Sequence, residues 1–431
     1  MAMLRPASEM KDSGIEWVGQ IPSNWRVVKN NRLFRITKTL VDDAWETTQL
    51  LSLTKGGIIE KNINDGGGKQ PESFSTYQFV EKDDIVLCLF DIDVSAVFSD
   101  RSPFDGMISP AYRVMKCEKI ILPVYAKWWF DAVNVGRYYL IYTKSLRKTI
   151  DSEGFGNILT AIPPLSEQRA IADYLDDRCS KIDEIIAEAT ASIEEYKELK
   201  QAVIFEAVTK GLDKSVPMKN SGDSWVGLCP VHYQLGQFSM LSSIVRGGSP
   251  RPAGDPRYYG GNIPFMRISD ITRDEEIYVN YCVHSITEEG FSRTREVPPH
   301  TLLLTNSGAT LGVPKITTFK TTFNDGIAAF LNIDDRLDIL FAYYYLKART
   351  SYFLESASMG MGQPNLNTDI IGRTHIVLPP KEEQLEIVEY LKNKCKIMDA
   401  LISEKQALID DLQAYKKSLI YEVVTGKRRV V

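Results

Sequence analysis

Residues 10–22 read MKDSGIEWVGQIP and residues 218–230 read MKNSGDSWVGLCP, so the chain carries two copies of one segment 208 positions apart. Both copies keep the pattern Ser-Gly-x-x-Trp-Val-Gly, which contains Trp17 in the first and Trp225 in the second. A repeat at a fixed offset indicates an internal duplication. The duplication is the feature from which the fold can be predicted.

A second repeat follows each copy. PPLSEQ at residues 163–168 recurs as PPKEEQ at residues 379–384, 216 positions later, and the similarity continues to Thr209 and Thr425. The stretches in between do not align with each other by inspection. We therefore predict six segments in the order lead-in, variable domain and conserved helix, twice over: 1–29, 30–162, 163–212, 213–237, 238–378 and 379–431.

Each second repeat has the pattern of a long helix. Apolar residues recur at heptad spacing after Pro164 and Pro380, and neither Pro nor Gly follows before Gly211 and Gly426. The residues expected to pair two helices are Leu175, Ile182, Ile186, Ile193, Leu391, Met398, Ile402 and Ile409. A long apolar stripe must be buried against a partner. That partner is a second chain in a generic coiled coil, or the other helix of the same chain, running antiparallel, which is the arrangement we expect.

The composition limits the class of protein. The chain has 431 residues, 44% of them hydrophobic, and no apolar run approaches the roughly 18 residues of a membrane span. The first residues lack the apolar stretch of a secretory signal, and the six cysteines form no C-x-x-C pair. These features favour a cytoplasmic protein with reduced thiols and no membrane contact.

The net charge does not argue against nucleic acid. The whole chain has 51 Lys plus Arg and 56 Asp plus Glu, a net charge of −5. Residues 163–212 alone contain 6 basic and 11 acidic residues, which accounts for all of it. The variable domains are therefore close to neutral and can bind a polyanion locally.

Signatures of catalysis are missing from the sequence. No G-x-x-x-x-G-K-[ST] loop occurs, and the Gly154–Gly156 segment is not followed by the Asn-Pro-Pro-aromatic tetrapeptide of an adenine methyltransferase. The four histidines lack the i, i+4 spacing of a metal pair. We predict a non-catalytic chain with no cofactor and no metal.

The second variable domain has three polar segments suited to DNA. Residues 246–273 combine five arginines with tyrosines on a Gly- and Pro-rich loop, and residues 305–312 and 360–367 present small polar side chains. Such side chains contact phosphates and base edges, although a solvated loop face has the same composition. The candidate DNA-binding residues are Ser249, Arg251, Arg257, Tyr258, Tyr259, Arg267, Ser269, Asn306, Ser307, Thr310, Gln363 and Asn365.

The first variable domain has a weaker signal. Its candidate DNA-binding residues are Lys55, Lys61, Asn62, Lys69, Arg101, Lys144 and Arg147. The apolar runs Ile85–Phe90 and Met107–Met115 predict strands. Both variable domains are thus expected to be mixed α+β structures rather than helix-turn-helix domains.

Together these motifs resemble the DNA-specificity subunit of a type I restriction–modification system, over nearly the whole chain. In the repeated frame the resemblance lies in SGIEWVGQIPSNW (13–25), SGDSWVG (221–227), PPLSEQ (163–168), PPKEEQ (379–384), VTKGL (208–212) and VVTGK (423–427). In the second domain it lies in GGSP (247–250), YYGGNIPFMRISDI (258–271), NSGATLG (306–312) and GQPNL (362–366). In the first domain it is weaker and lies in LSLTKGGI (51–58), KDDIVL (82–87) and ISPAYRV (108–114).

The resemblance implies an α+β fold, with two mixed target-recognition domains separated by an antiparallel pair of long coiled-coil helices. It implies that each domain recognises one half of an asymmetric bipartite site in double-stranded DNA, and that the helices set the gap. It also implies two modification subunits carrying S-adenosylmethionine, and restriction subunits using ATP and Mg²⁺. The alternatives are a non-catalytic coiled-coil scaffold for other proteins and a methyltransferase–specificity fusion.

Overall fold

The computed structural model describes residues 3–63, 73–95, 97–143, 147–358 and 365–430. The chain forms two compact units. Unit 1 comprises Met1–Thr190 and Gln406–Val431, and unit 2 comprises Ala191–Lys405. Each unit therefore contains part of both conserved segments.

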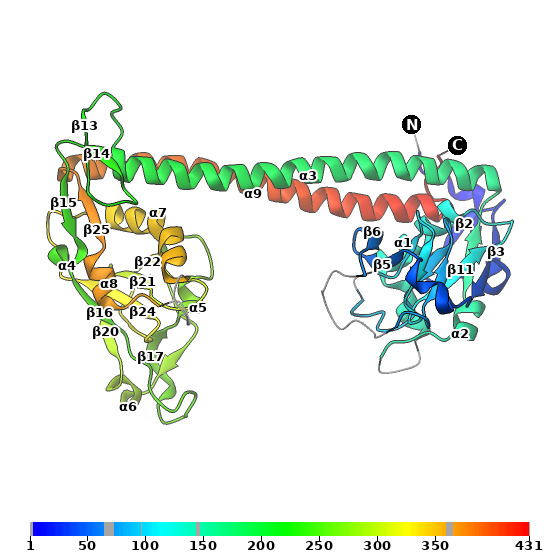
Figure 1. Cartoon of the computed structure of the whole chain (residues 1–431), viewed down its shortest axis with the longest axis horizontal. Helices are drawn as coiled ribbons and strands as arrows, with labels where there is room; N and C mark the ends of the chain where they lie inside the picture. The colour runs from blue at the N-terminus through cyan, green and yellow to red at the C-terminus, as the bar shows by residue number, and fades with distance from the viewer. Residues whose placement is uncertain (1–2, 64–72, 96, 144–146, 359–364, 431) are drawn as a thin grey trace. The chain divides into compact units, whose positions relative to one another are not determined.

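Two long helices confirm the predicted α+β fold with a helical pair. They are α3 (Leu165–Lys210) and α9 (Lys381–Val424), and each contributes to both units (Figure 1). In unit 1, Lys416 of α9 bonds Asp183 of α3 at 2.6 Å, and in unit 2 Lys200 bonds Asp399 at 2.6 Å. Lys200 lies 17 residues after Asp183, whereas Asp399 lies 17 residues before Lys416. Both units therefore pair the helices antiparallel in the same register.

The predicted heptad positions face inward in both units. Leu175 and Ile182 join the core of unit 1 together with Leu419, and Leu391 joins that of unit 2. Among the eight expected pairing residues, six are buried and two are half-buried. The buried ones are Leu175, Ile182, Ile193, Leu391, Met398 and Ile409, and the half-buried ones are Ile186 and Ile402.

Unit 1 contains two four-stranded sheets with helix α1 (Pro123–Gly136) in its core. The first sheet has the order β4 (Phe34–Thr37), β11 (Arg113–Cys117), β8 (Ile85–Leu87) and β9 (Ser99–Arg101). The second has the order β6 (Gly57–Lys61), β5 (Leu50–Thr54), β10 (Gly106–Ile108) and β7 (Gln78–Val80). The predicted strand over Met107–Met115 is wrong as one element, because a turn at 109–112 divides it between the two sheets.

Unit 2 repeats this plan. One sheet has the order β16 (Ser243–Arg246), β24 (Ile327–Leu331), β21 (Leu302–Thr305), β22 (Pro314–Thr317) and β18 (Tyr278–Val279). The other has the order β19 (Ser285–Ile286), β17 (Tyr259–Met266), β23 (Thr321–Phe323) and β20 (Arg295–Val297). Helix α7 (Ile339–Ser358) lies in the core, and the short helices are α4 (Phe238–Leu241), α5 (Ile268–Ile271) and α6 (Glu288–Phe291).

The two variable domains share one topology although their sequences do not align. The sheet β4-β11-β8-β9 matches β16-β24-β21-β22, with antiparallel neighbours throughout. The sheet β6-β5-β10-β7 matches β19-β17-β23-β20, and in both the inner pair is parallel. Unit 2 adds the edge strand β18, which pairs parallel with β22 and has no counterpart in the matching sheet of unit 1. The other differences between the domains lie in side chains and loops.

The C-terminal parts of the two variable domains correspond at a constant offset of 216 positions. Helices α1 and α7 begin 216 positions apart, as do α2 (Ser152–Asn157) and α8 (Thr368–Arg373), and β12 (Leu159–Ile162) and β25 (His375–Leu378). Strand β12 pairs with β3 (Arg26–Lys29), and β25 pairs with β15 (Gln234–Gln237). The second repeat thus extends back to the start of α1, beyond what the sequence alone indicated.

Each lead-in forms a hairpin that docks on the helices of its own unit. The hairpins are β1 (Met10–Asp12) with β2 (Gln20–Pro22), and β13 (Met218–Asn220) with β14 (Leu228–Pro230). Trp25 Nε1 donates to Glu167 at the start of α3 (3.0 Å), and the equivalent Tyr233 hydroxyl donates to Glu383 at the start of α9 (2.6 Å). The remaining short elements are the 3-10 helices η1 (Ala7–Glu9), η2 (Asn30–Arg32), η3 (Asp42–Glu46) and η4 (Tyr138–Tyr142).

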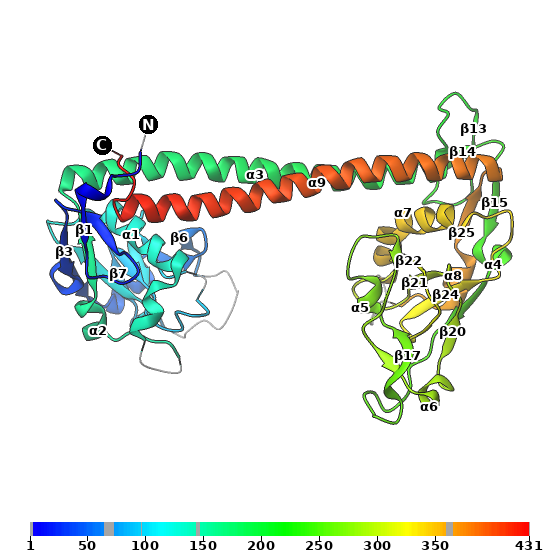
Figure 2. The ribbon, with the colours of Figure 1, turned by 180° about the vertical axis from the view of Figure 1, so that it is seen from behind.

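The two ends of the chain meet in unit 1. Leu4 forms an antiparallel bridge with Arg428, and the Arg5 amide donates to the Lys427 carbonyl at 2.8 Å. Figures 1 and 2 show the N and C labels beside each other in opposite views. In unit 2 the chain runs on covalently from the end of α3 into the lead-in. In unit 1 the segment after α9 and the lead-in are instead joined by these backbone hydrogen bonds.

Candidate nucleic-acid interface

The polar loops of unit 2 converge on the turn Asn324–Gly326, which joins β23 to β24. The Gly248 amide donates to the Phe323 carbonyl (3.1 Å), and the Asn324 amide donates to the Met266 carbonyl (3.0 Å). The Asn306 amide donates to the Gly326 carbonyl (2.9 Å). Segments from the first two predicted polar stretches are therefore held side by side by backbone bonds.

The arginines of this cluster combine exposure with local order. Arg251 has 73% of its side chain exposed, with Nη2 3.7 Å from the Asp325 carboxylate. Arg267 is half-buried, and its guanidinium lies over Tyr259 and Phe265, 5.7 and 5.9 Å from the ring centroids. The Tyr259 hydroxyl donates to the Pro250 carbonyl (2.7 Å), which ties β17 to the arginine loop. Guanidinium groups held in this way can contact phosphates or base edges without first being ordered.

The third polar segment joins the same cluster. Ser307 forms an isolated bridge with Asn365, and the Leu366 amide donates to the Asn306 carbonyl at 2.8 Å. Thr310 is exposed, as are Asn365 and Ser269 of α5, and Ser307 is half-buried. The structure thus brings together residues that are more than a hundred positions apart in the sequence.

Some predicted contacts occupy unsuitable positions. Tyr258 is 7% exposed and directly precedes β17, and Asn306 is fully buried and directly follows β21. Neither amide atom of the Asn306 side chain has a hydrogen-bond partner among the described residues. Arg257 is exposed but is paired with Asp255 at 2.7 Å. The predicted residues Lys69, Lys144 and Gln363 lie outside the described residues.

In unit 1 the predicted residues fall into separate groups. Lys55, Lys61 and Asn62 lie on the β5–β6 hairpin. Arg101 on β9 is paired with Asp83 at 3.0 Å. A further group is formed by Arg147, whose guanidinium is paired with Asp91 at 3.0 Å on another loop. The structure places Arg101 near the hairpin, because the neighbouring Asp100 carboxylate accepts from the Ile58 amide (3.0 Å), but it does not bring Arg147 to the same group.

The shared topology identifies positions in unit 1 that sequence reasoning missed. The arginine loop follows β16 in unit 2, and the equivalent segment after β4 begins at Lys38, which is exposed. The turn Asn324–Gly326 corresponds to the turn 109–112 between β10 and β11. Buried Gln78 holds that turn by donating to the Ser109 and Tyr112 carbonyls (3.2 and 2.9 Å). Strand order is the only signal for this equivalence, and it is not visible in the sequence.

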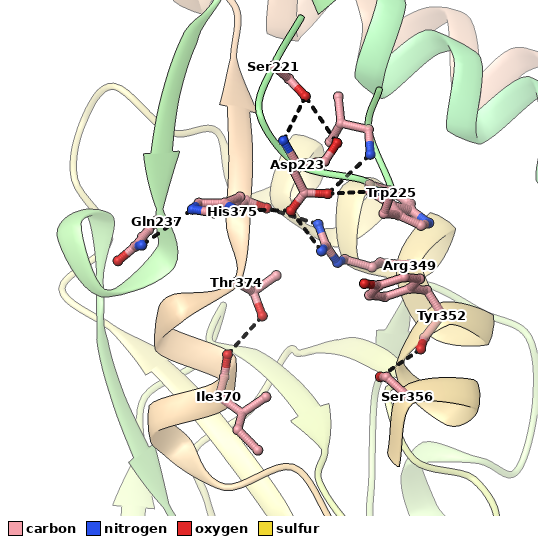
Figure 3. A network of polar contacts seen from close by, with 11 residues as sticks. Ser221, Asp223, Trp225, Gln237, Arg349, Tyr352, Ser356, Ile370, Thr374 and His375 are labelled. Atoms are coloured by element: carbon pink, nitrogen blue, oxygen red, sulfur yellow. Dashed lines mark hydrogen bonds and ion pairs between the residues drawn. The ribbon is translucent and has the colours of Figure 1, made fainter. Parts of the chain in front are cut away.

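A buried charge network supports the frame of unit 2 (Figure 3). Asp223 of the lead-in accepts from Arg349 Nη2 of α7 (3.0 Å) and lies 3.1 Å from His375 Nδ1 of β25. Its other oxygen accepts from the Trp225 and Val226 amides (2.9 and 3.1 Å). Burial raises the pKa of Asp223, but the Arg349 charge and these hydrogen bonds outweigh burial, so the pKa lies below its ordinary value. The ionised carboxylate thus joins the lead-in, α7 and β25.

Within the described ranges, no group of three or more His, Cys, Asp or Glu side chains is placed to hold a metal ion. None of the helices in the described part of the chain is long and apolar enough to cross a membrane.

Part of the chain matches a known domain, and the chain is similar to several known proteins. Residues 238–410 match the type I restriction modification DNA specificity domain. The chain is 25% identical to a proposed MjaX type I restriction enzyme specificity subunit of Methanocaldococcus jannaschii, over 66% of this chain and 62% of that protein. It is 26% identical to the EcoBI specificity subunit of Escherichia coli, over 65% and 60%. The matched region thus spans less than two thirds of either relative.

Solved structures show the same fold. The HsdS subunit of Thermoanaerobacter tengcongensis aligns with a TM-score of 0.53 at 16% identity, covering 94% of this chain and 98% of that one. A chain from a structural study of complex assembly and conformational transition in the type I R-M system aligns with a TM-score of 0.72 at 15% identity, covering 94% and 99%. The chain thus matches the type I restriction modification DNA specificity domain over residues 238–410, and it shares its fold with these solved structures.

Proposed function

We propose that the chain is the non-catalytic subunit that selects the DNA sequence for a type I restriction–modification enzyme. Each unit recognises one half of a bipartite site in double-stranded DNA. The observation that carries this proposal is the convergence of polar loops on the turn Asn324–Gly326 in unit 2, with the same strand framework in unit 1. One framework with different loop side chains suits one task performed on two different sequences.

The helices α3 and α9 are proposed to set the number of unspecified base pairs between the half-sites. Each helix is continuous and contributes to both units, and the antiparallel register is the same in both. A helix rises about 1.5 Å per residue, so its length converts directly into a distance. This supports a spacer whose length is determined by residue number.

Two modification subunits and further restriction subunits are the proposed protein partners. The outer faces of α3 and α9 expose large apolar residues, which include Ile185, Leu199, Ile397, Leu408 and Tyr415. Exposed apolar side chains on a helix are suited to a protein interface. The cofactors for methylation and cleavage would then be bound by those partners.

The direct test is a mobility-shift assay with the purified chain and its modification subunit on duplex DNA. We expect a sequence-dependent complex whose affinity falls steeply with salt. The double variant Arg251→Glu and Arg267→Glu should abolish binding while leaving the association with the modification subunit intact. Lys320→Glu is the matched control. Lys320 is an exposed basic residue directly before β23, whereas the arginine cluster lies at the turn after the other end of that strand. Absence of any sequence preference in the wild-type complex would refute the proposed function.

A further inference from the structure

An acidic residue lies at the centre of the arginine cluster of unit 2. Asp325 occupies the turn between β23 and β24, and its carboxylate accepts a hydrogen bond from the Ser249 hydroxyl. The same carboxylate lies 3.7 Å from Arg251 Nη2, and the Asp325 backbone carbonyl accepts from Arg246 Nε. One residue of the turn therefore contacts three donors from the single loop Arg246–Arg251.

The loop is seated on this turn so closely that only glycine fits. A Cβ at Gly247 would lie 2.3 Å from the Asn324 carbonyl oxygen, and one at Gly248 would lie 2.5 Å from the Arg293 carbonyl oxygen. The Gly247 amide donates to the Ile327 carbonyl (3.0 Å). The backbone of the loop is thus fixed up to Gly248, and the side-chain contacts of Asp325 order the residues that follow.

The charge of Asp325 opposes DNA binding as such. A carboxylate beside exposed guanidinium groups repels any phosphate that approaches them, whatever the base sequence. The Arg251 pair is long and largely exposed, so it contributes little stability of its own and exchanges easily for a new partner. The repulsion lowers the affinity for all DNA equally and therefore does not change selectivity. Ordering of Ser249 and Arg251 does change it, because donors held in one arrangement favour the duplex whose acceptors match them.

We propose that Asp325 is a positioning residue for sequence discrimination by unit 2. It orders Ser249 and Arg251 for one DNA geometry and weakens contacts to arbitrary duplexes. The inference rests on the proposed function, because it assigns a role within the same DNA-binding cluster. It differs from that function in predicting that loss of an acidic side chain impairs selectivity and not affinity.

The test is selection of bound sequences from a random duplex library by the full chain. The wild-type chain is expected to return two preferred sequence blocks. In Asp325→Ala, preference within one block should fall about tenfold, which corresponds to the loss of one good base contact, while the other block stays unchanged. Retention of a random duplex at low salt should not decrease. Asp325→Asn, which keeps an acceptor for Ser249, should restore part of the preference.

Asp334→Ala is the matched control. Asp334 is a turn carboxylate of similar exposure (35% against 40%) that pairs with Arg336 in the same unit, at 2.8 Å. It should leave both blocks unchanged. The inference is overturned if both blocks are as strong in Asp325→Ala as in the wild type, or if both weaken to the same extent. Either result leaves the proposed function standing. The same loss in Asp334→Ala would also overturn the inference, whereas absence of any block with the wild-type chain refutes the proposed function itself.

Discussion

Asp223 and Arg349 form a buried ion pair in unit 2 at the positions where unit 1 has Ile15 and Val133. The lead-ins align at an offset of 208 and the helices α1 and α7 at 216, so each residue has one counterpart. All four side chains are buried. The third member of the network, His375, has Leu159 as its counterpart. The same junction is therefore made by charges in one unit and by apolar contacts in the other.

This exchange predicts that the three residues of the network are coupled. Asp223→Ile alone leaves the buried Arg349 without its acid and should lower the free energy of unfolding of unit 2 by about 3–5 kcal/mol. The triple variant Asp223→Ile, Arg349→Val and His375→Leu reproduces the apolar junction and should recover most of that loss. Hydrogen exchange of the amides of α7 in the full chain measures both effects.

The converse variant in unit 1 is the control. Ile15→Asp places an unpaired carboxylate among apolar side chains and should increase exchange in α1 without affecting α7. If the triple variant exchanges as fast as Asp223→Ile, the junctions are not equivalent and the comparison between the units fails.

The network also predicts a dependence on pH. The pKa of Asp223 lies below its ordinary value of 3.8, because the Arg349 charge and the hydrogen bonds outweigh the effect of burial. The folded state therefore binds this proton less readily than the unfolded state. The stabilisation is present above about pH 4 and is lost as the pH falls through the folded-state pKa. Urea unfolding at pH 5 and pH 3 should show a larger loss for the wild type than for the triple variant, and equal losses would contradict this account.

Each long helix has one buried glutamine in its first turn, Gln168 in α3 and Gln384 in α9. Gln168 accepts from the Leu122 amide (2.7 Å) and donates to the Ile120 and Pro163 carbonyls (2.9 and 3.0 Å). Gln384 makes the equivalent bonds in unit 2, with the Asp338 amide and the Arg336 and Pro379 carbonyls.

Replacing either glutamine should destabilise only its own unit. Gln168→Ala and Gln384→Ala each leave buried backbone groups unpaired, at a cost of about 1–3 kcal/mol per group. Thermal unfolding with hydrogen exchange resolved by unit measures this. Gln201→Ala is the control, because Gln201 is exposed on α3 and should change stability little. An effect of Gln168→Ala on unit 2 equal to that on unit 1 would refute the assignment.

The frame of the fold could be predicted because its signals are local. Absence of Pro and Gly and a heptad pattern predicted α3 and α9, and identical lead-in residues predicted the duplication. The shared topology of the variable domains could not be predicted. Several of their strands have only three residues, such as β8 and β10, which is too short for a periodic pattern, and the parallel pairing of β5 with β10 joins distant segments.

The candidate site was predictable only in part, for a related reason. The composition around Arg251 and Ser307 marked loops of unit 2 that the structure brings together. Asp325 was missed because a lone acid in a turn has no distinctive sequence pattern, and its role depends on a loop 76 positions away. Burial of Asn306 depends on packing between segments, so a polar loop in the sequence does not reveal which of its side chains face outward.

The most direct test of the account changes the length of the helical pair. Inserting one heptad between Thr190 and Ala191 in α3, and one between Leu408 and Ile409 in α9, preserves the observed register, since these positions face each other in it. Seven residues lengthen the pair by about 10 Å, which is about three base pairs of DNA. Selection from a random duplex library should return the two wild-type blocks with a gap about three base pairs longer. An unchanged gap, or altered blocks, would contradict the account.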